Sequence, residues 1–488
     1  MNKYVLISFF ATTTLFIDSC AVNPVTGKKQ VVLMSEAQEI AMGKDADPQI
    51  VAQYGLYEDK DLQSFINQEG RKMAAVSHRP NLAYEFKIVD SDVLNAFAIP
   101  GGYVYFTRGI MANFNNEAEF AGVLGHEIGH ITARHSVAQQ RNSILGQIGL
   151  IAGMVIAPDL AQFADQASQG LGLLFLKFGR DAEREADQLG AEYSSKIGFD
   201  AQQMAEFFTT LERQAEESGN PGLPAFLSTH PNPGDRYTAV SKAAADWKKK
   251  LNLTNAQINR NTYLRRIEGL VYGEDPKQGF VENSIFYHPV LKFQFPIPSN
   301  WAFQNTPQRF QMAPKDGKAM MMLTLAPGKT LQESANGVLQ QYNLQAIESK
   351  QVSVNGLNAI AMVADLKSDQ AQQQQQQSQE VVRTLSYVIQ YGDLNYLMIG
   401  VTGSNSFNNY APVFTNAMQN FRTLTDASKL NKKPERIRLK TVSQTQTLQQ
   451  VLKTYKTADK RLSELAILNG MKLTDKVAPG TLIKIIGE

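Results

Sequence analysis

The residues best placed to do chemistry lie in one short segment, His126-Glu127-Ile128-Gly129-His130. Two helix residues that are four apart lie about 40° apart on one face, so both imidazoles can reach a single metal ion. Glu127 lies beside that face, where its carboxylate can touch a metal-bound water without being a ligand. The pattern predicts a zinc site with Glu127 as general base.

A catalytic zinc ion usually has three protein ligands and one open position, so a third ligand must come from elsewhere in the chain. The candidate is Glu183, which shares a helix face with Asp187 four residues later. Glu185 lies about 160° away from both and is the poorer choice. The alternative for this stretch is a solvated, charged helix face.

Such a site would hydrolyse peptide bonds. Zinc lowers the pKa of bound water, Glu127 takes the proton, and the hydroxide attacks a peptide carbonyl. His230 and Asp187 are candidates for stabilising the oxyanion, and Asp187 could equally hold a ligand histidine in place. We expect one zinc ion per chain. The alternative is a pair of solvated histidines on a structural helix.

The helix that carries the segment is expected to begin at Asn116, which has capping-box spacing to Glu119, and to run to about Gln140. On that helix His135 faces about 180° away from His126, so we expect a structural role for it. One flank holds three glycines, a composition that indicates close approach of another backbone. The helix with Glu183 has small residues of its own, so we expect it to dock there. The glycines are Gly122, Gly125 and Gly129, and the small residues are Ala186 and Gly190.

The N-terminus has the pattern of a targeting segment. Lys3 precedes a short apolar run, Tyr4 to Phe16, and the only cysteine of the chain follows at Cys20. The arrangement resembles a bacterial lipoprotein signal, which implies a lipid on Cys20 and a place in the cell envelope, facing the periplasm on the outer membrane. The alternatives are an ordinary secretory signal or an uncleaved anchor.

Composition and length describe an ordinary globular chain of several domains. The 488 residues are 43% hydrophobic and 19% charged, and the formal net charge of +2 does not point to nucleic acid. We expect a signal over 1–20, a protease domain over 21–260, an α/β domain over 277–425, a basic linker over 426–440 and a small module over 441–488. Residues 144–157 are strongly apolar and are expected to form a buried helix or hairpin, or a flap against membrane or over the active site.

Three segments together resemble the zinc metallopeptidases of family forty-eight, which include the CAAX prenyl endopeptidases; the closer likeness is to periplasmic members. They are HEIGHITARH (126–135), EREAD (183–187) and STHPNPGDR (228–236). The resemblance implies zinc at His126, His130 and Glu183, Glu127 as base, and Asp187 as a proton donor. It also implies that His230 approaches the metal as a switch or stabiliser.

A further segment, which begins at Asn95, Ala96 and Phe97, resembles the family's stretch ahead of the metal-binding helix. In the family this stretch is an edge strand of the cleft. Such an edge is suited to pair with an extended substrate backbone, so the resemblance implies substrate binding at these residues.

The expected fold is α+β and multidomain. The resemblance implies a mainly helical zincin-type (gluzincin) domain with a small edge sheet. FPIPSNW (295–301) and the strand order resemble PsbP/Mog1-type α/β domains. The C-terminal residues resemble a βααβ LysM module, through the segments 465–470 and 479–481. That likeness implies peptidoglycan binding through 441–488.

These features favour an envelope metalloendopeptidase that degrades or processes unfolded or misassembled exported proteins. Two other classes stay open. One is a chaperone or adaptor whose protease is self-inhibited, and the other is a peptidoglycan-anchoring binding protein.

Overall fold

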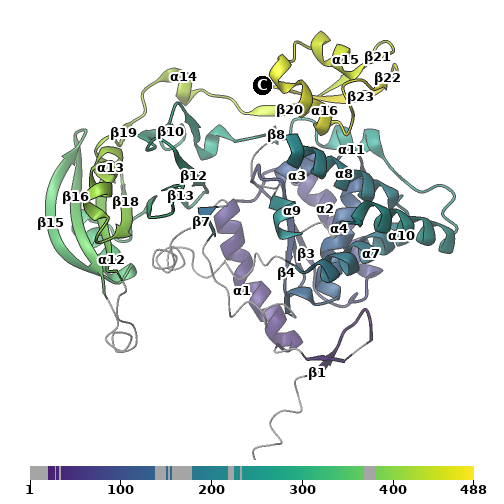
Figure 1. The fold of residues 1–488 in the computed structure, drawn as a ribbon, viewed down its shortest axis with the longest axis horizontal. Helices are drawn as coiled ribbons and strands as arrows, with labels where there is room; N and C mark the ends of the chain where they lie inside the picture. Colours follow the sequence, from purple (N-terminus) through teal and green to yellow (C-terminus); the bar gives the residue numbers. More distant parts are fainter. Residues whose placement is uncertain are drawn as a thin grey trace, which may run out of the picture.

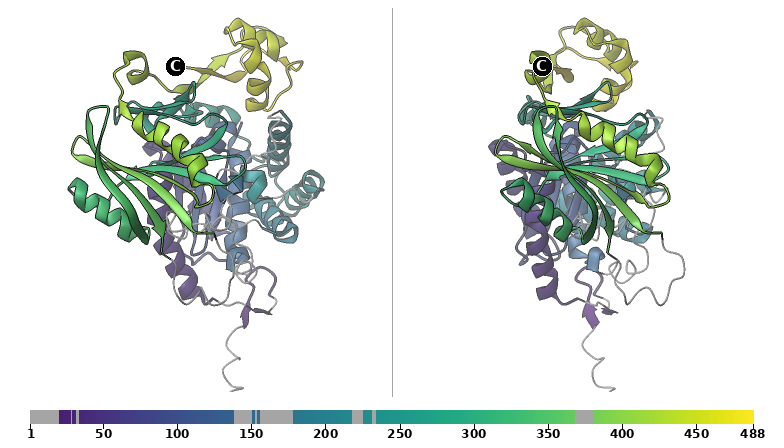
Figure 2. Two further views of the ribbon diagram at one scale, coloured as in Figure 1. Left: turned by 60° about the vertical axis from the view of Figure 1, so that its left-hand side comes forward. Right: turned by 90° about the vertical axis from the view of Figure 1, so that its left-hand side faces the viewer.

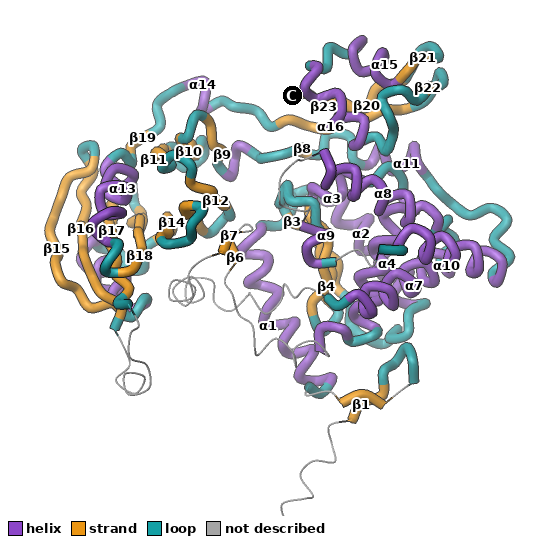
Figure 3. Tube along the Cα trace, in the orientation of Figure 1, coloured by secondary structure: helices purple, strands orange, loops and turns teal. Residues whose placement is uncertain are grey.

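The chain folds into a helical domain, a strand-rich α/β unit and a small C-terminal unit (Figure 1). The computed structural model describes residues 20–27, 29–31, 34–137, 150–151, 154–155, 178–217, 225–230, 234–367 and 380–488. The multidomain α+β class expected from the sequence is confirmed. Figure 3 shows the division clearly, with helices gathered in one part and strands in the other.

The helical domain surrounds a three-stranded sheet of order β3-β5-β4, in which β4 is an edge strand. β3 (Glu85–Val89) runs parallel to β5 (Tyr103–Thr107), and β4 (Ala96–Ile99) runs antiparallel to β5. A two-stranded ribbon of β1 (Cys20–Val22) and β2 (Lys29–Val31) precedes the helices. The helices are α1 (Glu36–Tyr54), α2 (Lys60–Ala75), α3 (Arg108–Asn113), α4 (Glu117–Thr132), α7 (Arg180–Lys196), α8 (Gln202–Glu217), α9 (Ala225–Thr229), α10 (Arg236–Lys250) and α11 (Arg260–Arg266).

Helix α4 is the centre of this domain and is buried on every side. Asn116 caps its N-terminus by accepting a hydrogen bond from the Glu119 amide. A Cβ on Gly125 would lie 2.9 Å from the carbonyl oxygen of Gly190, and one on Gly129 would lie 3.3 Å from the Cα of Ala186. The predicted docking of the Glu183 helix on the glycine flank is therefore confirmed.

The same helix is shorter than expected. It ends at Thr132 instead of about Gln140, because Arg134 adopts a left-handed conformation with φ of 56°. A new helical turn begins at His135, and the residues after 137 lie outside the described part of the chain. The direction in which His135 points therefore does not follow from the helical period of α4.

The α/β unit is built on a seven-stranded antiparallel sheet of order β12-β13-β14-β18-β17-β16-β15. Figure 2 shows this sheet as a twisted fan with α13 lying across it. A second, four-stranded sheet and α13 pack on one face, and α12 packs on the other. The elements are β9 (Phe280–Glu282), β10 (Ile285–His288), β11 (Phe293–Pro296), β12 (Trp301–Asn305), β13 (Arg309–Pro314), β14 (Ala319–Leu325), α12 (Leu331–Gln341), β15 (Leu344–Val354), β16 (Leu357–Leu366), β17 (Val382–Tyr391), β18 (Leu394–Gly403), α13 (Phe407–Gln419) and β19 (Arg422–Thr423).

The C-terminal unit joins the helical domain instead of following it as a separate body. Strand β20 (Glu435–Thr441) pairs with β23 (Leu482–Gly487) on one side and with β8 (Val271–Tyr272) on the other. Its helices α15 (Leu448–Thr454) and α16 (Leu462–Leu468) contribute to the same hydrophobic cluster as α2 and α4. Residues 426–440, expected as a linker, thus contain α14 (Ala427–Leu430) and a sheet strand.

Three further features complete the description. Within the apolar stretch 144–157, β6 (Leu150–Ile151) pairs with β7 (Met154–Val155), and the rest lies outside the described residues, as does the glutamine run 372–377. Among the described helices, none has the length and apolar character needed to cross a membrane. A cavity of about 850 Å³ lies between α1 and the α/β unit, and none of its lining residues belongs to the site described next.

Candidate metal centre

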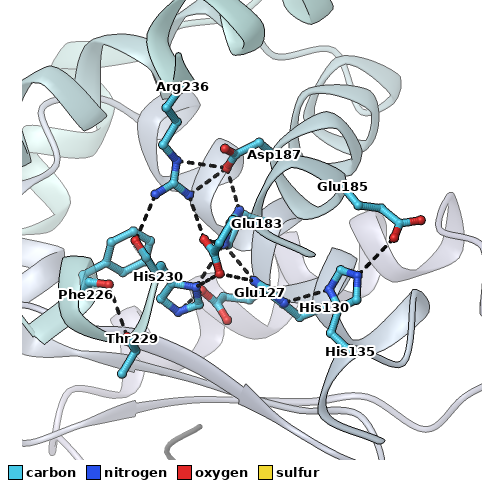
Figure 4. Close-up of polar contacts among 11 residues, drawn as sticks. Glu127, His130, His135, Glu183, Glu185, Asp187, Phe226, Thr229, His230 and Arg236 are labelled. Carbon is cyan, nitrogen blue, oxygen red and sulfur yellow. Dashed lines mark hydrogen bonds and ion pairs between the residues drawn. The ribbon is translucent and has the colours of Figure 1, made fainter. Parts of the chain in front are cut away.

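Four buried side chains from three helices converge on one point: His126 and His130 from α4, Glu183 from α7, and His230 directly after α9. His126 Nε2 lies 3.0 Å from His130 Nε2 and 3.2 Å from His230 Nδ1. Glu183 lies 3.5 Å from His130 Nε2, 3.6 Å from His126 Nε2 and 3.1 Å from His230 Nδ1. The structure thus brings together all three predicted ligands and His230 (Figure 4).

These distances fit a cation that the four side chains surround in tetrahedral coordination. Nitrogen and oxygen ligands lie about 2.0–2.2 Å from zinc, which places them about 3.3–3.5 Å from one another. His126 Nε2 faces two other imidazole nitrogens, and mutual hydrogen bonding cannot satisfy three such atoms as well as a shared cation can. A donor set of imidazole and carboxylate is typical of zinc, so His126, His130 and Glu183 would hold it.

Glu127 lies beside the ligands and is completely buried. Neither of its carboxylate oxygens has a hydrogen-bond partner among the described residues, and the nearest ionisable contact is His230 Nε2 at 3.6 Å. Burial raises the pKa of Glu127 above its usual value, while His230 and His126 lower it. A buried carboxylate with two free acceptors is what a general base needs when it addresses a small polar molecule in the site.

Asp187 and Arg236 support the site from behind His126. Asp187 Oδ1 lies 2.9 Å from His126 Nδ1, the nitrogen opposite the ligand atom. Arg236 donates to the same oxygen at 2.7 Å and to Glu183 at 3.4 Å. Burial alone would raise the pKa of Asp187, but Arg236 and His126 hold it below its usual value. These contacts favour the orienting role for Asp187 that the sequence left open.

Arg236 is the functional residue that sequence reasoning missed. It lies within STHPNPGDR, which the sequence singled out, but only His230 was selected there. Its side chain is 1% exposed and its guanidinium lies 3.7 Å from the centroid of the Phe208 ring. The only available signal was an arginine close to the motif histidine.

His230 is held from two sides. Its ring stacks on Phe226 at a centroid distance of 4.6 Å, and its Nδ1 contacts Glu183. Burial lowers the pKa of His230, but Glu183 and Glu127 raise it more, so the net shift is upward. In this arrangement His230 occupies the fourth corner of the ligand set, the position that a catalytic zinc site keeps open.

The predicted substrate strand lies next to this site. Ala96 and Phe97 belong to edge strand β4, and Asn95 directly precedes it. The Phe226 amide donates to the Leu94 carbonyl, which ties α9 and His230 to this strand. Phe97 packs its ring on Tyr105, whereas the Asn95 side-chain oxygen is buried without a hydrogen-bond partner among the described residues. Cys20 begins β1, which lies apart from the metal centre in Figure 1.

Two known proteases are similar in sequence to about half of this chain or less. The beta-barrel assembly-enhancing protease of Escherichia coli strain K12 is 31% identical over 239 residues, which cover 47% of this chain and 48% of that protein. The mitochondrial metalloendopeptidase OMA1 of Arabidopsis thaliana is 30% identical over 190 residues, covering 38% of this chain and 37% of the relative. The chain spans about half the length of the first of these relatives.

Solved structures are similar to this chain over about a third of its length. Cyanobacterial PsbP from Synechocystis is covered to 96% by 30% of this chain, with 11% identity and a TM-score of 0.23. The Saccharomyces cerevisiae Ran-binding protein Mog1p is covered to 99% by 31% of this chain, with 8% identity and a TM-score of 0.23. The arrangement of its own strands confirms the strand-rich α/β character of residues 277–425, and the more specific PsbP/Mog1 and LysM likenesses stay predictions.

The family resemblance carried by the three sequence motifs is confirmed. The profile described as Peptidase family M48 matches residues 60–244, a span that contains the four converging side chains, Glu127, Asp187 and Arg236. Residues 60–244, which carry the whole site, are therefore similar to peptidase family M48.

Proposed function

We propose that this protein is a zinc-dependent metalloendopeptidase with one zinc ion per chain. The observation that carries the proposal is the convergence of His126, His130 and Glu183, with the unpaired carboxylate of Glu127 beside them. The names of the relatives, a protease and a metalloendopeptidase, support the same reaction class.

Each residue has a defined part in this proposal. A bound zinc ion would acidify water and polarise the scissile carbonyl. Glu127 accepts the proton from the attacking water and passes it to the leaving amine. Asp187, clamped by Arg236, keeps the His126 ring oriented toward the metal. The edge strand at Asn95, Ala96 and Phe97 aligns the substrate as an added β-strand.

The substrates in this proposal are unfolded or misassembled proteins of the bacterial cell envelope. Support comes from the relatives named for enhancing β-barrel assembly, since bacterial β-barrels are outer-membrane proteins. We also propose a lipid on Cys20 that attaches the chain to the outer membrane, facing the periplasm, and binding to peptidoglycan through 441–488. The first rests on the lipoprotein-like signal, and the second on the LysM-like pattern.

Glu127→Gln tests the reaction. This change keeps the shape of the side chain and removes the base, so turnover of an unfolded substrate should fall at least about 100-fold with zinc content unchanged. Glu192→Gln on α7 is the matched control, because that carboxylate pairs with Lys196 and not with the metal centre. Unchanged turnover in Glu127→Gln would show that the chain is not a metalloendopeptidase.

Metal analysis tests the ligand set independently of turnover. The purified wild type should contain one zinc ion, and Glu183→Ala should lose it, because two imidazoles alone hold zinc weakly. An equal zinc content in the two proteins would remove Glu183 from the site.

A self-inhibited protease with a chaperone or adaptor role is the second candidate. The position of His230 within the ligand set favours it, since this ring takes the place that a substrate carbonyl and water need. If His230 blocks the site, His230→Ala should raise turnover of an unfolded substrate. If His230 instead stabilises the oxyanion, the same variant should lower turnover with little change in KM.

A further inference from the structure

Two residues outside the ligand set, His135 and Glu185, form a chain of contacts that ends on the metal ligand His130. We propose that this pair is a positioning relay that holds the His130 imidazole in the tautomer and orientation required for zinc binding. The inference rests on the proposed zinc site and adds two residues to it. His135 and Glu185 do not touch substrate or metal, so their role is to act through His130.

The contacts fix the direction of each hydrogen bond. His130 Nε2 faces the other ligands, so it must be free of a proton to bind a metal. The proton of the neutral ring is then on Nδ1, which lies 2.9 Å from His135 Nδ1 and donates to it. His135 must therefore carry its own proton on Nε2, which donates to Glu185 Oε2 at 3.1 Å.

The two metal-binding histidines are thus oriented by different means. His126 has the Asp187 carboxylate directly behind its ring. Among the described residues, none places a carboxylate at that position of His130, and the His135 imidazole bridges the gap to Glu185 (Figure 4). Ligand histidines commonly pass their second ring nitrogen to a carboxylate or carbonyl, and the relay supplies this through one intermediate ring.

The surroundings leave His130 with few other partners. Its ring is 1% exposed, and Phe178 stacks on it at a centroid distance of 4.0 Å. Water therefore cannot readily replace His135 at Nδ1.

The position of His135 follows from the way in which α4 ends. Arg134 reverses the chain with a φ of 56°, a conformation that costs about 1 kcal/mol or more for a residue other than glycine. Its side chain is anchored by a bond to Glu39 of α1 at 3.0 Å, and Glu39 also binds Arg79 at 2.8 Å. Arg79 in turn donates to the Ile131 carbonyl in the last turn of α4.

Zinc affinity of the apo protein, measured against a competing chelator, tests the relay without relying on activity. His135→Phe keeps the ring volume and removes the acceptor, so affinity should fall about 10- to 100-fold. His135→Gln restores an acceptor and a donor and should recover most of that loss. Glu185→Gln should weaken binding by roughly 10-fold, and its side chain is 28% exposed, so this variant tests the relay even if His135→Phe does not fold.

The double variant separates a relay from two independent packing effects. Because Glu185 acts only through His135, Glu185→Gln should add nothing to the loss already caused by His135→Phe. Two controls match the chemistry of the changes: His78→Phe, whose ring contacts Tyr193, and Glu192→Gln on α7. Both should bind zinc like the wild type.

The outcomes distinguish the relay from the function on which it rests. A wild type that binds no zinc would remove the proposed function. A wild type that binds zinc while His135→Phe and Glu185→Gln bind it equally well would overturn the relay alone. Losses that multiply in the double variant would also overturn it, since they would show two separate effects.

Discussion

At the scale of single residues, the metal centre depends on one buried cation that is not itself a ligand. Arg236 bonds Asp187 through two of its nitrogens, at 2.7 and 3.2 Å, and reaches both Glu183 and the His230 carbonyl at 3.4 Å. It thereby balances two buried carboxylates and fixes the start of the loop after His230. Among the described arginines and lysines, only Arg236 forms ion pairs with Glu183 and Asp187.

Replacing Arg236 should lower the free energy of unfolding much more than replacing an exposed arginine. Arg236→Met removes the partner of two buried carboxylates, so we expect the zinc-free protein to lose about 3–5 kcal/mol in free energy of unfolding. Arg184→Met is the matched control, because Arg184 is 42% exposed and its ion pairs are at the surface. That change should cost less than about 1 kcal/mol. Denaturant unfolding of both variants checks the difference, and equal losses would contradict the argument.

The two kinds of residue in this site differ in how far a sequence reveals them. Residues His126, Glu127 and His130 follow from helical spacing alone, since the spacing itself determines which side chains share a face. Arg236 could not be found in the same way, because its partners Glu183 and Asp187 lie about fifty residues earlier on another helix. The direction of the His135 side chain could not be derived either, because the helical period stops applying where Arg134 ends α4.

At the scale of elements, the site exists because α4 and α7 pack at very short range. Gly125 and Gly190 lie against each other, and a Cβ on Gly190 would be 3.1 Å from the His126 amide nitrogen. This contact brings the backbone of the Glu183 helix to the backbone of the histidine helix. The ligands from the two helices can then meet with ordinary side-chain lengths.

Gly125→Ala tests this dependence, and the sign of its effect is informative. Helix propensity alone favours alanine by about 1 kcal/mol. The added Cβ would lie 2.9 Å from a carbonyl oxygen and 3.0 Å from a Cα, and neither backbone atom can move aside cheaply. We therefore expect a net loss of about 1–3 kcal/mol in stability together with weaker zinc binding.

The control for that prediction is Gly179→Ala, at the N-cap of α7, where an added Cβ meets no atom of the described residues within 4 Å. This substitution should change the free energy of unfolding by no more than about 0.5 kcal/mol. If Gly125→Ala stabilised the protein as propensity predicts, the two helices would not need their close contact.

Some helices and strands could be predicted from the sequence and others could not, and the reasons lie in the residues of each element. Helix α7 matches the helix expected around Glu183 and Asp187, because its amphipathic pattern is strong. The sequence pattern of residues 351–363 predicts one continuous strand, which is wrong, because β15 and β16 form a hairpin around Asn355-Gly356. That dipeptide is a strong hairpin signal that the apolar run obscured. Strand β12 is half-buried throughout and β13 is buried along its middle four residues, so neither has the alternation that marks a strand in a sequence.

At the scale of the whole molecule, the α/β unit is an insertion. Strand β8 ends at Tyr272 and pairs antiparallel with β20, where Tyr272 lies opposite Glu435. The chain therefore leaves this sheet at Tyr272 and returns to it at Glu435, directly opposite, and the residues between them form the α/β unit. The cores of the α/β unit contain only its own residues, whereas the C-terminal unit shares its core with the helical domain. Pairing across such a sequence gap has no local signature, so the sequence alone could not reveal it.

The C-terminal unit is also fastened by buried polar contacts. Lys484 is completely buried, and its Nζ donates to the carbonyls of Ala112 and Phe114, directly before α4. Burial lowers the pKa of this lysine to about 7. Arg260 donates to the Leu482 carbonyl and adds a further bond between the two parts. A unit attached in this way supports the N-terminal end of the metal-binding helix.

This topology predicts opposite results for two deletions. Replacing residues 274–433 with Asn-Gly would leave a four-residue hairpin loop between β8 and β20, which is a common loop length. The shortened chain should fold and bind one zinc ion with an affinity close to that of the full chain. Truncation after residue 434 removes fewer residues, yet it strips β20, β23 and the shared core from the helical domain. That product should aggregate or unfold without cooperativity. Size-exclusion chromatography, thermal unfolding and zinc titration of both proteins test this prediction. The contrary result would be a protein truncated after residue 434 that binds zinc normally, while the protein with residues 274–433 replaced does not. That result would show that the α/β unit is not the inserted one.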